Sequence, residues 1–516
     1  MLRSKSPQAS FFGSYLYDRI VPEDHLLRKI NQVVDFSFVR EIVKDKYDPN
    51  MGKPAWDPEF MMKLCLLQYL YGDSDRRVVE NARLNLAYKY FLGLSVDAEV
   101  PDDTTISYFR AKRLGEEDFR RVFEGIVQQC IDQGLVTGKR QIVDSTHVVA
   151  DMAITSLTEL VRLCRLNVLQ SIAQHNRKTA RKLGLNQTEM PRPDKYARKE
   201  EGLEQELERA SALLDGVTHE LKKGTLKVTK DLQTHLDLLE KAVADREEGS
   251  KDRLVSPVDP DARMGRKESR RWAGYKGHVL MEEDSEIITA IETTPGNTND
   301  GSQLKPLLKH QKTAHALIPE ELSADKAYDT GENLESLVSN GIIGTIALSR
   351  RGNNHHPELF SVEDFHYDAD SDTLTCPGEC TSQLRRRAVF RSQTQRKLGK
   401  VFQFRSHECN NCQLKSKCHQ GDRGRAVYIS YYHQLYEEMK ERLQTKEGKI
   451  AYRNRLRIEH RVADLARWCG MRRSRYRGMG RVRIHMLLAA MVSNVKRMTQ
   501  MLWHMPEPVP KLGEAV

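Results

Sequence analysis

Two acidic residues interrupt segments whose other residues favour burial. Asp144 lies within the β-branched run RQIVDSTHVVA at 140–150, and Asp325 lies within the strand pattern ELSADKAYD at 321–329. A buried carboxylate without a partner costs several kcal/mol, so each must lie at a strand end, pair with a cation or bind a metal ion. For one such aspartate a turn or a cap is the simpler explanation. Two of them in strands of one domain make that explanation weaker.

A third acidic residue, Glu459, stands in the strongly basic helical pattern AYRNRLRIEHRVADLARW at 451–468. Taken alone, it would be explained as the ion-pair partner of neighbouring arginines. Enzymes that cut or join phosphodiesters, however, use two divalent ions about 3.5 to 4 Å apart, one at the attacking oxygen and one at the leaving oxygen. Hard oxygen ligands suit Mg²⁺. Two aspartates from neighbouring strands and one acid from a packed helix therefore indicate a two-metal site.

The strands that would position these carboxylates can be read from alternating and β-branched patterns. They lie at 140–150, 274–283, 285–296, 321–329 and 342–350. The second and third are joined by a tight Glu-Asp-Ser turn, which favours an antiparallel pair. The last two are separated by the helical pattern TGENLESLVSNG, which favours a parallel pair with a right-handed crossover. We therefore predict an α/β fold with a mixed five-stranded sheet flanked by helices.

The N-terminal residues 1–135 carry helical patterns throughout. Asp57 is placed to cap a helix that begins at Pro58, and Asp102 or Asp103 is placed to cap another. A helix before that second cap, across a short glycine-containing loop, would be compatible with a helix-turn-helix that reads DNA. A plain helical bundle explains the same pattern.

Five of the nine cysteines are concentrated in one segment, which indicates metal ligation in a reducing compartment. They are Cys376, Cys380, Cys409, Cys412 and Cys418. Tetrahedral zinc takes four thiolates, and each short loop can deliver two of them. Spacing alone favours Cys376, Cys380, Cys409 and Cys412 as a zinc ribbon, with reduced cysteines that bind no metal as the alternative. The others, Cys65, Cys130, Cys164 and Cys469, lie in apolar helical patterns and are expected in the core.

Composition and charge limit the class of protein. The 516 residues exceed the roughly 250 to 300 that one hydrophobic core supports, so we expect several domains. Lys and Arg number 82 against 72 acidic residues, and residues 451–500 hold thirteen of these cations with two acids. Such a segment favours a polyanionic partner. The sequence shows neither an apolar run of membrane-spanning length nor a secretory signal pattern, so we expect a cytoplasmic protein without a membrane partner.

The patterns divide the chain into segments with different compositions. We predict a helical DNA-binding region at 1–135, a catalytic core at 136–155 and 265–350, a helical insertion at 156–264, a cysteine-rich insertion at 351–430, basic helices at 431–502 and a tail at 503–516. The insertion is assigned from three long charged stretches with leucines at three- and four-residue spacing.

Several of these motifs resemble the DDE transposases of bacterial insertion sequences. They are VDSTHV around Asp144, GYKGH at 274–278, TPGNTND at 294–300, ADKAYD around Asp325 and YRNRLRIE at 452–459. The last matches the family signature of Tyr, two residues, Arg, three residues and Glu, with all three anchors expected on one helix. The segments DPEFMMKLCLLQYLYGDSDRR and PDDTTISYFR resemble the helical domain that precedes catalysis in this family. The resemblance covers most of the chain and is closest to the group with a cysteine cluster before the catalytic glutamate.

The resemblance implies an RNase H-like catalytic domain that cuts the ends of an insertion sequence and joins them to target DNA. Asp144 would bridge two Mg²⁺ or Mn²⁺ ions, Asp325 would hold one, and Glu459 would complete the site of the other. Water would attack first, and the freed 3′ hydroxyl would then attack the target. Tyr452 and Arg455 would stack on a base and grip a phosphate. Relatives in the group suggest Cys376, Cys409, Cys412 and Cys418 as the zinc ligands.

The sequence departs from the family signature at one position. A Lys usually follows seven residues after the Glu, and here that residue is Ala466, so Arg461 or Arg467 would have to replace it at the DNA. The alternative is therefore a catalytically inactive, domesticated DNA-binding protein of the same descent, and a nuclease without strand transfer is a third option. The implied partner is double-stranded DNA, as terminal inverted repeats and target, in the bacterial nucleoid. Joining two ends implies an assembly of at least two chains.

Overall fold

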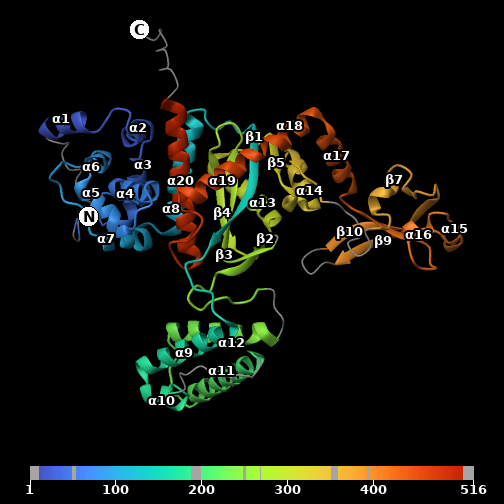
Figure 1. Cartoon of the computed structure of the whole chain (residues 1–516), viewed down its shortest axis with the longest axis horizontal. Helices are drawn as coiled ribbons and strands as arrows, with labels where there is room; N and C mark the ends of the chain where they lie inside the picture. The colour runs from blue at the N-terminus through green and yellow to red at the C-terminus, as the bar shows by residue number, and fades with distance from the viewer. Residues whose placement is uncertain are drawn as a thin grey trace, which may run out of the picture. The chain divides into compact units, whose positions relative to one another are not determined.

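The computed structural model of the chain describes residues 11–48, 51, 54–186, 199–247, 252–267, 269–349, 358–391 and 396–503. The chain divides into two compact units. The first comprises Met1–Thr137, Asp144–Leu317 and Arg457–Val516, and the second comprises Gly138–Val143 and Ile318–Leu456. Figure 1 labels most of the helices and strands of each unit.

The N-terminal part of the first unit is helical, as predicted. Helix α4 (Pro58–Leu70) begins with Pro58 at its first position, and the Asp57 side chain accepts a hydrogen bond from the Glu59 N–H. Helix α7 (Asp103–Tyr108) is capped by Asp102. The preceding helix, α6 (Leu86–Leu92), is separated from α7 by residues 93–102, which is longer than the three- or four-residue turn of a helix-turn-helix. The short loop expected there is wrong, and these helices pack as a bundle around the buried α4.

Strand β1 (Arg140–Val149) passes through both units. Within the second unit its first four residues pair in parallel with β5 (Glu321–Ala324), and β5 pairs in parallel with β6 (Ile343–Ile346). Helix α14 (Gly331–Ser339) connects β5 to β6. The parallel strand, helix, strand unit predicted from the sequence is therefore confirmed.

The antiparallel part of the sheet belongs to the first unit. Strand β3 (Arg270–Glu282) pairs with β4 (Ile288–Pro295) along its second half and with β2 (Arg263–Lys267) along its first residues. The strand order is β2-β3-β1-β5-β6, and β4 also pairs with β3. Because the first residues of β1 belong to the second unit and the others to the first, each pair of neighbouring strands lies within one unit. The sheet is mixed, as predicted, but it has six strands and not five. The sequence of β2, RMGRK, has no alternation, so its pairing is set by the length of β3.

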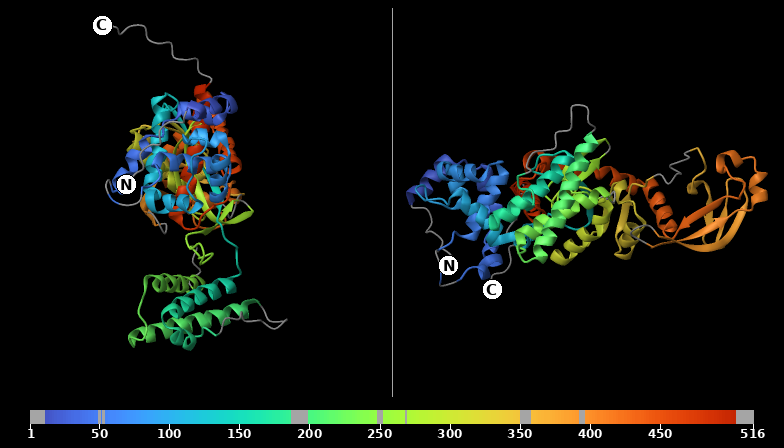
Figure 2. Two further views of the ribbon diagram at one scale, coloured as in Figure 1. Left: turned by 90° about the vertical axis from the view of Figure 1, so that its left-hand side faces the viewer. Right: turned by 90° about the horizontal axis from the view of Figure 1, so that it is seen from below.

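The insertion forms a helical bundle with its own core inside the first unit. Its helices are α9 (Leu157–His175), α10 (Arg177–Lys182), α11 (Lys199–Lys222) and α12 (Lys230–Glu247). Figure 2 shows them packed on one another. Leucines, valines and alanines of α9, α11 and α12 form the buried core, which also holds an ion pair between Arg165 and Glu206 at 2.6 Å. The three long helices are therefore confirmed, and the short α10 is additional.

The cysteine-rich segment of the second unit contains a five-stranded antiparallel sheet of order β11-β10-β9-β8-β7. Its strands are β7 (His366–Asp368), β8 (Thr373–Thr375), β9 (Thr381–Arg391), β10 (Arg396–Gln403) and β11 (Ala426–Ser430). Two short helices, α15 (Ser406–Asn410) and α16 (Lys415–Cys418), lie between β10 and β11. A small core formed by Phe365, Leu374, Phe402 and Val427 has four of the cysteines packed against it.

The C-terminal helices are α17 (His433–Gln444), α18 (Lys446–Asn454), α19 (Leu456–Trp468) and α20 (Met479–Trp503). The segment 451–468 was expected to be one helix, and that expectation is wrong because α18 ends before Arg455 and α19 begins after it. Each helix buries its own face, α18 with Ala451 and α19 with Ile458 and Leu465.

Apolar and small side chains cover almost the whole of α20, which packs against α8 (Gly115–Asp132), α4 and β4. Across the described ranges, none of the helices combines the length and the apolar composition that crossing a bilayer requires. Apart from Trp503, the predicted tail at 503–516 lies outside the described residues.

Candidate active site

Asp144 lies on β1, directly after the last residue that pairs with β5. The ladder between these strands ends with Val143 opposite Ala324. Asp144 follows Val143 within β1, and Asp325 follows Ala324, the last residue of β5. The Asp144 side chain is half-buried, and its Oδ1 atom accepts a hydrogen bond from the Ser145 N–H at 2.7 Å.

Asp325 begins the short 3-10 helix Lys326–Tyr328. Its Oδ1 atom accepts a hydrogen bond from the Ala327 N–H at 2.8 Å. Asp325 therefore caps this short helix, which is the local role that a single aspartate in such a pattern would have. A second carboxylate of the ADKAYD motif, Asp329, accepts a hydrogen bond from the Ser349 N–H at 2.7 Å. The neighbouring Thr330 caps α14, and its side chain accepts a hydrogen bond from the Asn333 N–H.

Glu459 lies in the first turn of α19 and is exposed. Two arginines of this helix hold the turn that follows β3: Arg457 donates to the Glu283 carbonyl at 3.0 Å, and Arg461 forms an ion pair with Glu286. Beyond the helix, the Arg472 carbonyl accepts from the Val149 N–H at 3.0 Å, and the Ser474 N–H donates to the Val149 carbonyl at 2.8 Å. The helix that carries Glu459 is therefore fixed both to the β3–β4 turn and to the end of the strand that carries Asp144.

The four residues predicted to contact DNA differ in exposure. Tyr452 is 39% exposed, whereas Arg455 is 9% exposed, and its guanidinium carbon lies 5.5 Å from the centre of the Tyr452 ring. Arg461 is engaged by Glu286, and Arg467 is exposed. Of the two arginines that could replace the lysine missing at position 466, Arg467 has the more accessible side chain.

Two motifs that carry the family resemblance meet across β3 and β4. Lys276 of GYKGH donates a hydrogen bond to Asp300 of TPGNTND at 2.8 Å, and the Nε2 atom of His278 lies 2.8 Å from the Thr294 hydroxyl. His278 is fully buried, and burial lowers its pKa to about 4. Burial also lowers the pKa of His147, which packs on the Trp272 ring. Both histidines are therefore neutral at pH 7.

The first glycine of GYKGH is required by backbone packing. Gly274 has a φ of +155°, and a Cβ atom there would lie 2.1 Å from the Val148 carbonyl oxygen of β1. Only glycine allows the two strands to approach so closely in this conformation. The glycine of this motif thus allows β3 to pack closely against β1, the strand that carries Asp144.

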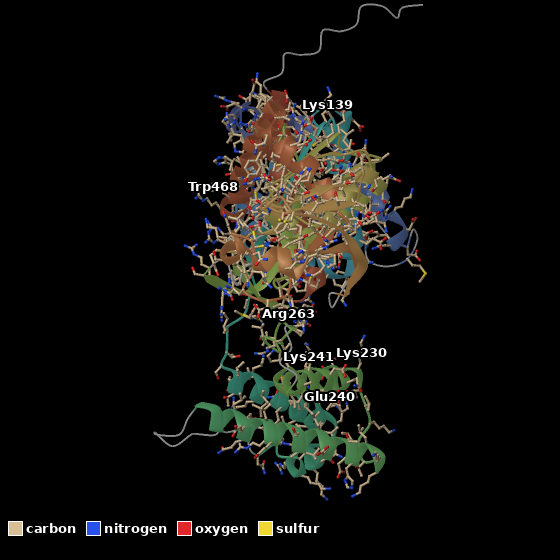
Figure 3. All side chains as sticks on the ribbon, turned by 90° about the vertical axis from the view of Figure 1, so that its right-hand side faces the viewer. Lys139, Lys230, Glu240, Lys241, Arg263 and Trp468 are labelled. Carbon is tan, nitrogen blue, oxygen red and sulfur yellow. The ribbon has the colours of Figure 1, made fainter. Side chains whose placement is uncertain are left out.

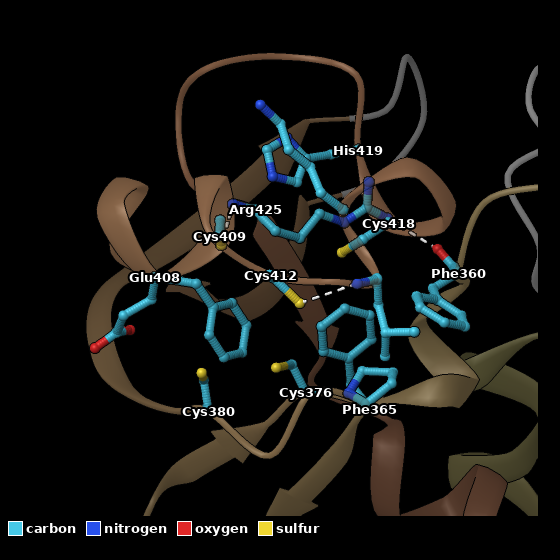
Figure 4. Close-up of a pocket in the computed structure, with 15 residues that line it drawn as sticks. Phe360, Phe365, Cys376, Cys380, Glu408, Cys409, Cys412, Cys418, His419 and Arg425 are labelled. Atoms are coloured by element: carbon cyan, nitrogen blue, oxygen red, sulfur yellow. Dashed lines mark hydrogen bonds between the residues drawn. The ribbon is translucent and has the colours of Figure 1, made fainter.

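The five clustered cysteines line one cavity of the second unit, together with Phe360, Phe365 and Phe404 (Figure 4). Its volume of about 30 Å³ is close to that of one water molecule. The Leu414 N–H donates to the sulfur of Cys412 at 3.4 Å, and the Arg425 N–H donates to the sulfur of Cys409 at 3.5 Å. Among the residues described, no group of three or more His, Cys, Asp or Glu side chains is arranged so that it could hold a metal ion.

Burial raises the pKa of the Cys380 and Cys418 thiols, and the neighbouring thiols of the cluster raise it further. The remaining four cysteines are buried, as predicted: Cys65, Cys130 and Cys164 lie in helices, and Cys469 directly follows α19.

Two family models match the sequence. Residues 15–112 match a transposase domain (DUF772), and residues 249–495 match a transposase DDE domain. The chain belongs to the insertion-sequence DDE transposases. The second match takes in Asp325 and Glu459, whereas Asp144 precedes it. Membership of this family implies a transposition enzyme that acts on DNA, and DDE domains generally use divalent metal ions.

Sequence reasoning missed the anchors of α19. Arg461 and Glu286 are 175 positions apart in the chain. Glu286 has a φ of +57° in the turn between β3 and β4, whereas the sequence predicted a strand that already included it, at 285–296. Neither segment contains a pattern that would have predicted a contact between Arg461 and Glu286.

Proposed function

We propose that this chain is a DNA transposase that cuts the ends of its own insertion sequence and joins them to target DNA. In this proposal Asp144, Asp325 and Glu459 are the metal ligands of an RNase H-like site. The observation that carries it is the register of β1 and β5. Parallel strands end at the same edge of a sheet, where α/β enzymes hold their ligands. The ladder runs to Val143 and Ala324, and an aspartate follows each.

The donor set fits Mg²⁺ or Mn²⁺. All three side chains offer carboxylate oxygens, the ligands that hard divalent cations prefer. Asp144 and Asp325 are half-buried at the ends of their paired segments, and each uses one oxygen in a local hydrogen bond. When bound, two such ions supply activation of the attacking oxygen and stabilisation of the leaving oxygen. Asp144 would bridge them, Asp325 would hold one, and Glu459 would complete the other.

The residues of the chain bind and orient the DNA, and none of them acts as the nucleophile. Water attacks the phosphodiester at the end of the element and breaks its bond to the 3′ oxygen, and the 3′ hydroxyl released then attacks a target phosphodiester and displaces the target's own 3′ oxygen. Tyr452 offers an exposed ring for a base, and Arg455 lies against that ring. Arg467, one position after Ala466, is the cation that replaces the usual lysine. Terminal inverted repeats and target DNA are the partners, and joining two ends requires at least two chains.

The cysteine cavity is the second part of the proposal. Its thiols are the ligands that zinc takes, and four of the five would hold one zinc ion that supports the small sheet, although in the described structure they are not gathered into a metal site. Backbone N–H groups donate hydrogen bonds to the sulfurs of Cys409 and Cys412, the kind of contact that orients metal-binding side chains. The fourth ligand is either Cys380, as spacing suggests, or Cys418, as the family resemblance suggests.

The experiment is a cleavage and strand-transfer assay on duplex DNA that carries the ends of the element, with Mg²⁺ or Mn²⁺. We expect Asp144→Asn, Asp325→Asn and Glu459→Gln to abolish both products and to leave DNA binding intact. Asp329→Asn is the matched control, because its amide oxygen can still accept the Ser349 N–H, and it should cleave normally. If the unaltered chain binds the ends and never cuts them, the domesticated DNA-binding protein is the better description. If cutting occurs without joining, the chain is a nuclease.

A further inference from the structure

One end of the helical insertion gathers exposed cations from three segments, and we name it the basic end. Its members are Arg177, Lys178, Arg181 and Lys182 of α10, Lys222 at the end of α11, Lys223 and Lys227 of the following loop, and Lys230 at the start of α12. All eight side chains are exposed. Figure 3 labels Lys230 at the start of α12, with Glu240 and Lys241 further along the helix.

Side-chain hydrogen bonds hold these segments together. The Asn176 side chain, which caps α10, donates to the Thr225 carbonyl in the α11–α12 loop at 3.4 Å. Lys182 at the other end of α10 donates to Glu220 of α11 at 2.6 Å. Ser171 of α9 donates to Asp231 of α12 at 2.7 Å. The cations therefore share one surface of a packed bundle, and they are not a run along an extended chain.

The two acids of this end are already engaged. Glu220 accepts hydrogen bonds from Lys182 and Thr225, which hold its pKa at about 2, so it stays charged and paired. Asp231 accepts from Ser171 and lies 3.6 Å from His235. Eight cations against two engaged acids leave this end strongly positive.

The rest of the bundle has the opposite sign. In residues 156–176, 202–219 and 232–245 there are eight acids, at positions 159, 204, 206, 208, 215, 237, 240 and 245, against four cations, at positions 162, 165, 209 and 241. A surface that only has to be soluble intersperses both signs. Segregation of charge to one end is instead the arrangement that attracts and orients a polyanion.

We propose that the basic end of the insertion is a second DNA-binding site, which holds the phosphates of a duplex outside the carboxylate site. The choice of DNA as the polyanion rests on the proposed function. The contact itself needs no metal ion and no catalysis. Each cation that neutralises a phosphate releases a counterion, so this site adds to the salt dependence of DNA binding without adding sequence preference.

The experiment measures affinity against salt concentration. The full chain is titrated into a fluorescently labelled duplex of mixed sequence, without added Mg²⁺ or Mn²⁺ so that no cleavage occurs. The variant Lys178→Gln, Arg181→Gln, Lys223→Gln removes three exposed cations. We expect the slope of log affinity against log salt to fall by about 2.7, because each lost phosphate contact removes about 0.9. With the affinity at 1 M salt unchanged, this slope implies a loss of affinity of roughly 500-fold at about 0.1 M salt.

The control carries the same change in net charge on the acidic part of the bundle. Gln205→Glu, Ser211→Glu, Ala212→Glu alters exposed positions of α11 and also lowers the charge by three. We expect its slope to match that of the unaltered chain. Thermal unfolding checks that both variants are folded. Equal slopes for the two variants, whether both lowered or both unchanged, would overturn the proposal. Loss of cleavage in a separate assay would count against the proposed function and not against this site.

Discussion

The ion pair between Arg461 and Glu286 tests how Glu459 is positioned. The two side chains are 11% and 24% exposed. Exposed ion pairs contribute about 0.2 to 1 kcal/mol, and removing one partner of a fully buried pair costs about 3 to 5 kcal/mol. This pair lies between those limits, so we expect Arg461→Ala to weaken the attachment of α19 to the β3–β4 turn by about 2 kcal/mol.

The remaining attachments should keep α19 folded. Arg457 still donates to the Glu283 carbonyl, and residues 472–474 still bond to Val149. Glu459, which lies two residues before Arg461, would nevertheless lose its fixed position. A misplacement of about 1 Å costs on the order of 100-fold in rate. We expect Arg461→Ala to slow single-turnover cleavage of a labelled duplex end by about 10- to 100-fold, with DNA affinity unchanged.

The Glu286→Gln variant separates this account from the view that Arg461 replaces the missing lysine at the DNA. If Arg461 contacts DNA, releasing it from Glu286 should tighten DNA binding and leave cleavage intact. If Arg461 positions α19, cleavage should slow as it does in Arg461→Ala. The exposed Arg467→Gln is the control, expected to lower the salt slope by about 0.9 with little effect on the rate at saturating DNA. Full cleavage by Glu286→Gln would refute the reasoning.

Three further predictions concern stability and metal content. Burial of His485, whose Nδ1 atom lies 2.8 Å from the Tyr69 hydroxyl, lowers its pKa to about 3. Between pH 6.5 and pH 3, His485 is therefore protonated in the unfolded chain and neutral in the folded chain. The free energy of unfolding keeps its full value above pH 6.5 and falls by up to about 1.4 kcal/mol per pH unit down to pH 3. Thermal unfolding from pH 7 to 5 should show this loss, and His485→Gln should flatten it; an equally steep loss in the variant would exclude His485 as its cause. Gly274→Ala should cost about 1 to 3 kcal/mol or more in a denaturant titration because its Cβ meets the Val148 carbonyl, whereas Gly202→Ala, where nothing lies within 4 Å, should be neutral or stabilising. Mass spectrometry of the native chain should find one zinc, lost in Cys409→Ser and in Cys412→Ser, with Cys380→Ser and Cys418→Ser deciding the fourth ligand; a native chain without zinc would contradict the assignment.

Local signals predicted the elements well because their causes are local. Asp57 was identified as a cap, and Asp102 was one of two candidates for another; each accepts a hydrogen bond from an N–H of its own helix. The antiparallel pair β3–β4 and the parallel pair β5–β6 followed from alternation and from the intervening helix. Strand β2 was missed because its charged sequence has no alternation of apolar and polar residues. It pairs with the first residues of β3, which extends further than predicted.

The break between α18 and α19 was missed for a different reason. Neither Gly nor Pro marks it, and Arg455 keeps a φ of −50° and a ψ of −31°, within the helical region. Tyr452 lies on α18 and Glu459 lies on α19. The residues of the family signature therefore have the expected spacing in the sequence, but they do not lie on one helix. For the candidate site, the carboxylates stood out because their charge conflicts with a buried strand. The contacts that fix α19 could not be predicted, because they join residues far apart in the chain.

The most direct test of the central claim, that Asp144 and Asp325 hold the metal ions, is metal rescue of cysteine variants. A thiolate is a soft ligand that binds Mg²⁺ poorly and tolerates Mn²⁺ better. We expect Asp144→Cys and Asp325→Cys to cleave the ends of the element with Mn²⁺ and not with Mg²⁺, while Asp325→Asn cleaves with neither. Cleavage by the cysteine variants in Mg²⁺ at the rate of the unaltered chain would contradict the account.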